Sequence, residues 1–288
     1  MASVLITGTS KGIGLEAALA FGRAGYSVFA TMRNPANSPA LAQTAAKEKL
    51  AITVSVMDVD SDESVRRGIA SIYKDHGPID VLVNNAGVER SGSVEELPLA
   101  DFRAVMETNY FGVIRCVQAV APHMRQRRSG CIVNVSSVAG RITSPPLASY
   151  TASKWALEAM SEALAGELKT FGVRVLIVEP GIIDTAMARR IGDASMASPY
   201  PQQARFASLF QASLKNPAPP SLVAQKILEI AGNGTWQLRH LVGPDAAPFL
   251  EWRKTMTDEE WVELYGSDDE TWYSRIERDF GMNTRPAK

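Results

Sequence analysis

Short apolar runs alternate with amphipathic segments along most of the chain. The runs are rich in Val and Ile and predict buried strands at 3–7, 27–31, 52–57, 79–83, 131–136, 173–178 and 238–242. Apolar residues at helical spacing lie in most of the intervals, at 15–24, 61–75, 101–125, 150–169 and 222–231. The alternation predicts an α/β fold, a Rossmann-type doubly wound parallel sheet of about seven strands with helices on both faces.

Residues 186–220 interrupt this alternation. They follow a predicted strand and mix Met, Ala and Pro with aromatic side chains such as Phe206 and Phe210. A segment of this length and composition predicts a mobile lid over an apolar substrate. We expect residues 1–245, which include the lid, to form a single domain.

The chain continues beyond the last predicted strand as residues 246–288. The tetrapeptides 257–260 and 267–270 both match the capping box Ser/Thr-x-x-Glu, so they predict two short helices. These helices carry three large aromatic residues, Trp261, Trp272 and Tyr273. Their rings would pack in the core, on the lid or on a neighbouring subunit. The sequence therefore predicts a C-terminal helical extension packed on the same domain.

The predicted helix 150–169 has apolar residues on two sides. A stripe of small residues would let it lie close on the sheet, namely Ala152, Ala156, Ala159, Ala163 and Gly166. A second ridge consists of Leu157, Met160, Leu164 and Leu168. A helix with two apolar sides is either deeply buried or shared with another subunit.

Charge and cysteine usage exclude several classes of function. The 288 residues include 30 Lys and Arg against 31 Asp and Glu, so no net field attracts nucleic acid or an anionic membrane. Cys116 and Cys131 lie apart in apolar segments, which favours buried thiols in a reducing compartment. The histidines lack ligand spacing, no apolar run reaches membrane-spanning length, and a strand beginning at Ser3 leaves no room for a signal peptide. We therefore expect a cytoplasmic protein without a metal site.

A glycine-rich turn separates the first predicted strand from its helix. Such a turn lets backbone amides approach a pyrophosphate, which the amino end of the helix attracts. The spacing GxxxGxG alone is also that of an ordinary tight turn. Its place after the first strand favours a dinucleotide site formed by Gly8, Ser10, Lys11, Gly12, Ile13 and Gly14.

The tip of the second predicted strand bears on the choice of cofactor. A carboxylate here would hold a ribose hydroxyl of NAD, whereas an Arg can hold the additional phosphate of NADP. The range 26–47 contains no acid, and Arg33 together with Lys11 can face that phosphate. The tip predicts NADP (NADPH), with NAD less favoured; the alternative is that both side chains only extend into water.

Further candidates follow the third and fourth predicted strands. Asp58 and Val59 would either bind an adenine edge or form an ordinary surface turn. Asn85, Ala86 and Gly87 form a turn that would let a flat ring system approach closely. All five residues would lie at the carboxyl edge of the sheet, where ligands bind in open α/β folds.

The predicted chemical centre combines a phenol, an amine and a hydroxyl. Tyr150 and Lys154 are four residues apart, so a helix places both on one face. A nearby ammonium lowers the pKa of a phenol, which can then exchange a proton with an alcohol or ketone oxygen. Ser137 follows the fifth strand and can bind the same oxygen. Taken alone, a Tyr-x-x-x-Lys pair more often lies in solvent. Asn109, a poor mid-helix residue, would mark a bend that frees a carbonyl for water.

Together these motifs resemble the short-chain dehydrogenase/reductases of the one-domain form over residues 1–245. The resemblance rests on Thr7-Gly8-x-x-x-Gly12-Ile13-Gly14, Asp58-Val59, Asn84-Asn85-Ala86-Gly87, Asn109, Ser137, Tyr150-x-x-x-Lys154 and Pro180-Gly181-x-x-x-Thr185. It implies a dinucleotide-binding catalytic domain. The glycine turn followed by ATMRNP is similar to the NADP-preferring branch that includes type 1 17β-hydroxysteroid dehydrogenase and retinol dehydrogenases.

The resemblance also implies a role for each residue. Tyr150 would be the acid/base, and Lys154 would lower its pKa and bind the nicotinamide ribose. Ser137 would orient the substrate oxygen, and Asn109 would support a proton-relay water. Four residues after the sixth strand would contact the cofactor, namely Pro180, Gly181, Ile183 and Thr185. Relatives pair through the helices corresponding to 101–125 and 150–169, which implies a homodimer or homotetramer.

The sequence therefore predicts an NADP(H)-dependent oxidoreductase acting on CH–OH groups, either a carbonyl reductase or an alcohol dehydrogenase. It would interconvert a hydrophobic ketone or aldehyde and its alcohol by hydride transfer. One alternative is a catalytically silent NADP-binding sensor, which the presence of both Tyr150 and Lys154 disfavours. A second alternative is a sugar-nucleotide epimerase or dehydratase, which the Asn-Asn-Ala-Gly turn disfavours.

Overall fold

A computed structural model describes residues 1–193 and 198–285. Within them, seven parallel strands form one sheet in the order β3-β2-β1-β4-β5-β6-β7. The strands are β1 (Ser3–Thr7), β2 (Ser27–Met32), β3 (Ile52–Val56), β4 (Val81–Asn84), β5 (Gly130–Val135), β6 (Val173–Pro180) and β7 (Arg239–Val242). The predicted doubly wound sheet is confirmed.

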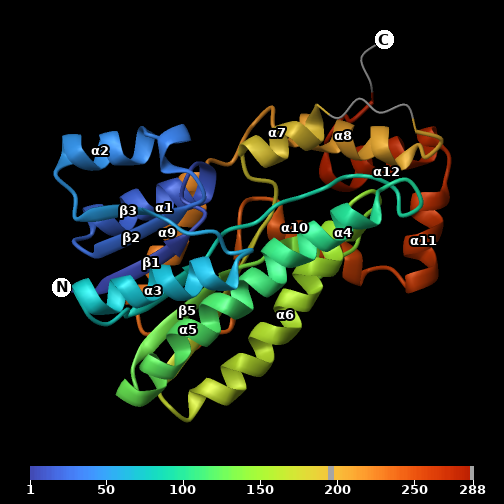
Figure 1. The fold of residues 1–288 in the computed structure, drawn as a ribbon. Coiled ribbons are helices and arrows are strands. Elements are labelled where there is room, and N and C mark those ends of the chain that lie inside the picture. Colours follow the sequence, from blue (N-terminus) through green and yellow to red (C-terminus); the bar gives the residue numbers. More distant parts are fainter. Residues whose placement is uncertain (194–197, 286–288) are drawn as a thin grey trace.

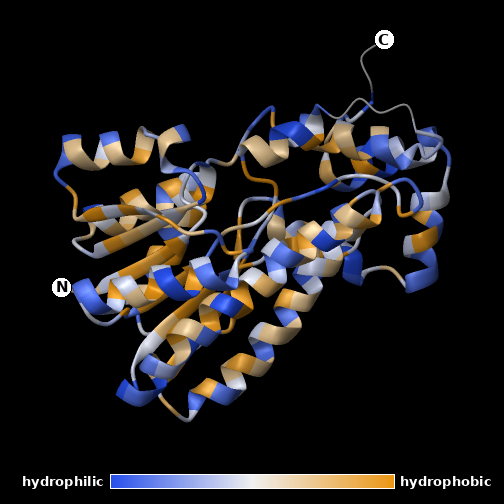
Figure 2. Ribbon diagram, viewed as in Figure 1, coloured by the Kyte–Doolittle hydropathy of each residue, from blue (hydrophilic) through white to orange (hydrophobic). Residues whose placement is uncertain are grey.

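Helices cover both faces of the sheet (Figure 1). The helices before β7 are α1 (Gly12–Arg23), α2 (Ala40–Glu48), α3 (Asp62–His76), α4 (Leu99–Met106), α5 (Gly112–Arg127), α6 (Ala148–Lys169), α7 (Ala186–Gly192), α8 (Gln202–Ser213) and α9 (Pro220–Gly232). Apolar residues of α1, α2 and α9 form the core on one face, and those of α3, α5 and α6 form it on the other. Because both faces are covered, the central strands β1 and β4 are buried along their whole length and consist mainly of apolar residues (Figure 2).

Helix α6 packs on the sheet with the opposite face from the one we predicted. Leu157, Leu164 and Leu168 are buried in the core, whereas Ala152, Ala159 and Ala163 are exposed. The larger side chains fill the space between helix and sheet and bury more apolar area, which favours this orientation. The leucine ridge is therefore core, and the stripe of small residues faces outward.

The predicted lid is largely helical. Helices α7 and α8 pack against the C-terminal extension, which contains α10 (Ala246–Lys254), α11 (Asp258–Gly266) and α12 (Asp269–Phe280). These helices gather at the end of the molecule away from β2 and β3 (Figure 1). Residues 194–197 of the predicted lid lie outside the described residues. The boundary between residues 245 and 246 stays a prediction.

Buried contacts fix the lid to the extension. Arg205 of α8 is 2% exposed, and its guanidinium pairs with Asp269 at 2.7 Å and donates to the Ser267 carbonyl at 2.8 Å. Trp272 and Tyr273 pack among the apolar residues of α7 and α8. Packing on the lid, one of the three predicted environments of these rings, is therefore present.

One of the two predicted capping boxes is correct. Thr257 accepts from the Glu260 amide, and the Glu260 carboxylate accepts from the Thr257 amide. The start predicted at Ser267 is wrong by one residue, because Asp268 caps α12 by accepting from the Thr271 amide at 2.8 Å. Asp and Ser are equally good N-cap acceptors, so the sequence does not choose between them.

The extension should contribute to global stability through Trp272. Replacing this 2% exposed residue with Ala removes a buried ring and should lower the free energy of unfolding by about 3–5 kcal/mol in urea titrations. Trp236, which is 49% exposed, provides a matched control whose Trp→Ala change should cost less than about 1 kcal/mol. Equal losses for the two variants would contradict a core role of the extension.

Candidate active site

Hydrogen bonds connect the end of β1 and its turn to the turn that follows β4. The Thr7 hydroxyl accepts from the amides of Asn85 and Ala86, both at 3.0 Å. The Asn85 side chain donates to the carbonyls of Thr7 at 2.9 Å and Gly8 at 3.1 Å. These bonds close the base of a crevice at the carboxyl ends of the two strands. The carboxamide of Asn85 therefore supports the turn.

The glycine turn leaves the amino end of α1 open. Gly8 has a φ of +71°, and a Cβ built on Gly14 would lie 2.3 Å from the Gly8 carbonyl oxygen. Only residues without a side chain allow this approach. Lys11, at the N-cap position, makes no side-chain capping bond. The first helical amides therefore remain available, and this cradle fits the pyrophosphate of a dinucleotide.

The predicted site residues, with one exception, line a single cleft of about 510 Å³. The predicted cofactor residues on its wall are Gly8, Ser10, Lys11, Gly12, Ile13, Gly14, Arg33, Asp58, Val59, Asn85, Ala86, Gly87, Pro180, Gly181, Ile183 and Thr185. Ser137, Tyr150 and Lys154 line the same cleft. The structure therefore brings together residues from both halves of the sheet.

Asn109 is the exception, because its side chain is engaged below the cleft. It lies in a π-helical turn, η2 (Glu107–Phe111), between α4 and α5, so the helix is irregular at the position for which we predict a bend. Its carboxamide accepts from the Val88 amide at 2.8 Å and donates to the Val88 carbonyl and the Ser153 hydroxyl, both at 2.9 Å. Asn109 thus ties the loop after β4 to α6. The predicted bond from its carbonyl to a water stays a prediction.

Tyr150 and Lys154 lie on one face of α6 as predicted, but their electrostatics differ from the prediction. The Lys154 ammonium is buried, donates to the Val135 carbonyl at 2.8 Å and lies 5.6 Å from the centre of the Tyr150 ring. Burial lowers the pKa of Lys154 to about 8 and raises the pKa of Tyr150 to about 12. The predicted lowering of the phenol pKa is therefore wrong for the protein alone, because desolvation dominates.

Ser137 begins a 3-10 turn, η3 (Val138–Gly140), and its hydroxyl accepts from the Ala139 amide at 3.1 Å. The same hydroxyl lies 3.4 Å from the Pro180 carbonyl oxygen. It also interacts with the Tyr150 phenol, which opposes the rise in the pKa of Tyr150. The two hydroxyls therefore meet at one place in the cleft.

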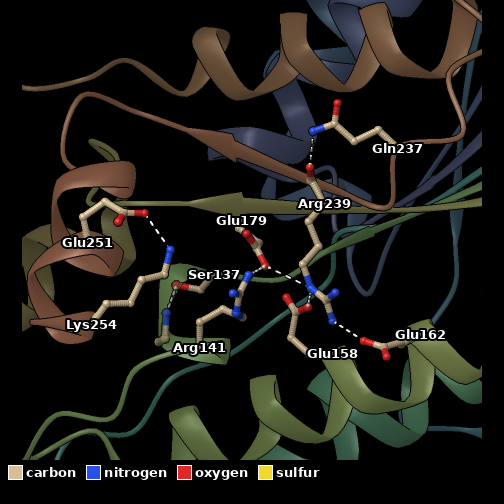
Figure 3. A network of polar contacts seen from close by, with 10 residues as sticks. Ser137, Arg141, Glu158, Glu162, Glu179, Gln237, Arg239, Glu251 and Lys254 are labelled. Atoms are coloured by element: carbon tan, nitrogen blue, oxygen red, sulfur yellow. Dashed lines mark hydrogen bonds and ion pairs between the residues drawn. The ribbon is translucent and has the colours of Figure 1, made fainter. Parts of the chain in front are cut away.

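The buried carboxylates of Glu158 and Glu179 belong to a network of ion pairs that links α6, β6 and β7 (Figure 3). Arg239 of β7 contacts Glu158 at 3.0 Å and Glu179 at 3.5 Å, and Arg141 contacts Glu179 at 3.3 Å. Glu158 lies one turn after Lys154 on α6, and Glu179 precedes Pro180 at the end of β6. The network thus joins α6 to the segments that carry Ser137 and Pro180.

The network also acts on the charge of Lys154. Burial, followed by the nearby charge of Glu158, raises the pKa of Glu179. The negative charge of Glu158 favours the ammonium form of Lys154 and partly opposes the effect of burial on its pKa. Glu158 therefore helps Lys154 to stay charged near neutral pH.

The two ends of the cleft differ in character. Lys11 and Arg33 are exposed at one end, where Asp58 both lines the cleft and accepts from the Asp60 amide of its own turn at 3.1 Å. The other end is largely apolar, and its wall is built by α6, the lid and the extension. Among its lining residues are Leu147, Phe206, Leu209, Phe249, Trp252, Trp261, Trp272 and Ile276.

Sequence reasoning missed several residues on this wall. Phe249 and Trp252 lie on α10, which we did not predict as a helix, although their spacing is helical. Glu89 and Arg190 also line the cleft, and no motif marks either residue. Within the described residues, no cluster of potential metal ligands is found, and no helix is long and apolar enough to cross a bilayer.

Comparison with known proteins agrees with this geometry. A family model described as short chain dehydrogenase matches residues 2–195, so the chain belongs to the short-chain dehydrogenase family. Oxidoreductase BOA17 of Botryotinia fuckeliana is 38% identical over 90% of this chain and 96% of its own. Retinol dehydrogenase 8 of Bos taurus is 43% identical over 69% of this chain and 64% of its own. The protein is therefore an oxidoreductase of a family that uses nicotinamide cofactors.

Solved structures show the same fold. A short-chain dehydrogenase from Streptomyces avermitilis superposes with a TM-score of 0.77 at 31% identity, covering 97% of this chain and 98% of its own. A variant of actinorhodin polyketide ketoreductase with NADPH gives a TM-score of 0.75 at 28% identity, covering 85% of this chain and 97% of its own. Because it covers 97% of this chain, the superposition with the first structure extends over the C-terminal helices.

Replacing Glu158 with Gln should lower the pKa of Lys154 below its value of about 8. The change removes the negative charge that favours the ammonium, so Lys154 should lose its proton at lower pH. Titration of the lysine side chain by NMR measures this directly. Glu162→Gln is the matched control, because Glu162 also pairs with Arg239, at 2.7 Å, but does not act on Lys154. Identical titration of both variants and the parent protein would refute the proposed effect.

Proposed function

We propose that the protein is an NADP(H)-dependent oxidoreductase that interconverts a hydrophobic ketone or aldehyde and its alcohol. One observation carries the proposal: Ser137, Tyr150 and Lys154 face the same cleft as the glycine turn. The hydroxyl pair can bind a single substrate oxygen, and the apolar end of the cleft can accept its carbon skeleton. No observation favours the silent-sensor alternative, because the complete set of reactive groups is assembled.

The cleft fits a phosphorylated dinucleotide along its length. The open amino end of α1 would hold the pyrophosphate, and Lys11 and Arg33 would face the additional phosphate of NADP. Gly12 and Thr185 approach across the cleft, since a Cβ built on Gly12 would lie 3.4 Å from Thr185 Cγ2. When bound, the nicotinamide would supply or accept the hydride. Lys154 would hold the adjoining ribose.

The protein's own residues would handle the proton. The pKa of Tyr150 is raised to about 12, so its phenol keeps its proton near neutral pH. An alkoxide that forms from a ketone is more basic still, so the phenol can protonate it. Ser137 would orient the oxygen that receives this proton. The raised pKa of Tyr150 therefore favours reduction of a ketone near neutral pH, with Tyr150 as the general acid.

The apolar wall supports a bulky substrate. Aromatic rings from the lid and the extension surround the cleft beyond Tyr150, among them Phe206, Trp261 and Trp272. Two similar proteins carry the names retinol dehydrogenase and polyketide ketoreductase, which denote large carbon-rich compounds. We therefore infer a substrate with an extended hydrophobic body.

We further propose a cytoplasmic homodimer or homotetramer without nucleic-acid or membrane partners. Phe111, at the end of η2, is 44% exposed, and Trp155, which lies among the outward-facing small residues of α6, is 48% exposed. An apolar surface of this kind suits contact with a second copy. Light scattering that found only monomers at micromolar concentration would exclude the assembly.

Tyr150→Phe should reduce kcat/KM for ketone reduction by about a thousandfold, because the phenol proton is lost while the ring remains. Affinity for NADPH, followed by its fluorescence, should change little. Tyr73→Phe is the matched control, since burial also raises the pKa of Tyr73 to about 12 but its hydroxyl lies outside the cleft. A Tyr150→Phe enzyme as active as the control would exclude the proposed acid.

Arg33→Ala should weaken binding of NADPH about tenfold and leave binding of NADH nearly unchanged. The expected loss is that of one charge-assisted contact to the additional phosphate. Lys47→Ala provides a control cation on α2, outside the cleft. If Arg33→Ala weakened both cofactors equally, Arg33 would not be the residue that selects NADP.

A further inference from the structure

The loop that carries Glu89 is held against α6 by contacts on both sides of this residue. The Asn109 carboxamide forms hydrogen bonds with the amide and the carbonyl of Val88 and with the Ser153 hydroxyl. The Arg90 carbonyl accepts from the Ser149 hydroxyl at 2.8 Å. Ser149 and Ser153 both lie on α6, in the turn that contains Tyr150. The backbone of the loop is therefore fixed to the catalytic helix immediately before and after Glu89.

The Glu89 carboxylate lies in the wall of the cleft. The residue is only 4% exposed, and one carboxylate oxygen accepts a hydrogen bond from the Ser91 hydroxyl. Within the described residues the other oxygen, Oε2, accepts no hydrogen bond; Arg190 lies 4.0 Å away and its side chain is 62% exposed. Burial raises the pKa of Glu89, and the charge of Glu89 in turn raises the pKa of Tyr150. The carboxylate is therefore close enough to the phenol to influence it.

We propose that Glu89 is a specificity-determining residue that binds a hydrogen-bond donor of the substrate, a hydroxyl or an ammonium group close to the reacting carbonyl. This inference rests on the proposed function and narrows its substrate class. The substrate would combine a bulky apolar body with one polar donor beside the carbon–oxygen bond that reacts. Oxygen Oε2 would accept the hydrogen bond.

The surroundings of Glu89 support this assignment. Glu89 as a whole is 4% exposed, but its Oε2 is not one of the fully buried oxygens without a partner, so this oxygen reaches the water of the cleft. The Arg190 guanidinium, 4.0 Å away on a side chain that is 62% exposed, is too distant for a hydrogen bond. A substrate donor that enters the cleft would replace water as the partner of Oε2. The clamped backbone would hold Oε2 in place before the substrate arrives, which reduces the entropy lost on binding.

Three aryl ketones test the proposal: acetophenone, phenacyl alcohol and phenacylamine. They share a reacting carbonyl and differ in the donor on the next carbon. We expect the protein with NADPH to favour both donor-bearing ketones over acetophenone by about tenfold in kcat/KM. In Glu89→Ala both preferences should fall to about one. In Glu89→Gln the hydroxyl preference should partly remain, because an amide oxygen still accepts, whereas the ammonium preference should disappear.

Two further variants separate this role from others. Glu95→Gln changes an exposed acid of the same loop and should keep both preferences. Arg190→Met should also keep them; if it abolished them as Glu89→Ala does, Glu89 would only anchor the lid, and the proposal would be wrong. Absence of any preference in the parent protein, or preferences unchanged in Glu89→Ala, would equally overturn it.

Thermal shifts of the NADPH-loaded protein with the same three compounds give a readout independent of turnover. Donor-dependent stabilisation that Glu89→Ala abolishes would support the binding role even if none of the ketones were reduced. In that case the proposed reaction would fail while the assignment of Glu89 stood. Turnover that depends on Tyr150 without any donor preference would give the reverse result.

Discussion

The crevice at the centre of the molecule depends on the hydrogen bonds of one threonine side chain. Strand β1 has β2 on one side and β4 on the other. The segments that follow β1 and β4 therefore leave the carboxyl ends of these strands in two directions. The Thr7 hydroxyl joins the turn after β4 to the end of β1 by accepting hydrogen bonds from two backbone amides of that turn. Gly8 and Gly14 can then approach Ala86 and Asn85 only because they have no side chains. The space left above these turns is where α/β folds bind their ligands.

The buried carboxylates of Glu89 and Glu158 both influence the reactive pair, and each favours the protonated form of one member. Glu89 favours the protonated phenol of Tyr150, and Glu158 favours the protonated amine of Lys154. Desolvation acts on the two groups in opposite directions, because it disfavours the charged form of each. The protein alone therefore holds a neutral phenol beside a lysine that titrates just above neutral pH. A site arranged in this way is suited to giving a proton to a developing alkoxide.

Much of the fold follows from patterns that the sequence makes visible. Val- and Ile-rich runs identify the strands because parallel strands are buried on both faces, and Asn109 marks the irregular turn because its carboxamide competes with helical bonds. The four-residue spacing likewise predicts that Tyr150 and Lys154 lie together on one face of a helix. The position of the glycine turn after the first strand likewise marks glycines that must lie next to backbone.

The remaining features depend on contacts that no local pattern encodes. The faces of α6 were assigned in reverse, because both stripes are apolar and only the space above the sheet selects Leu157 over Ala152. The pKa directions of Tyr150 and Lys154 follow from burial, which the spacing of the two residues does not reveal. Glu89 belongs to no motif, and only the hydrogen bonds of Val88 to Asn109 and of Arg90 to Ser149 fix its loop near α6 in the wall of the cleft.

The reacting groups and the aromatic wall come from different parts of the chain. Ser137, Tyr150 and Lys154 lie in its middle, whereas Trp252, Trp261 and Trp272 lie in the last helices and touch the strands little. Tyr150, however, packs against the apolar cluster that these helices form with the lid. Substitutions in that terminal segment can therefore reshape the space for a carbon skeleton and, through the ring of Tyr150, also shift the phenol, whereas Ser137 and Lys154 lie outside that cluster.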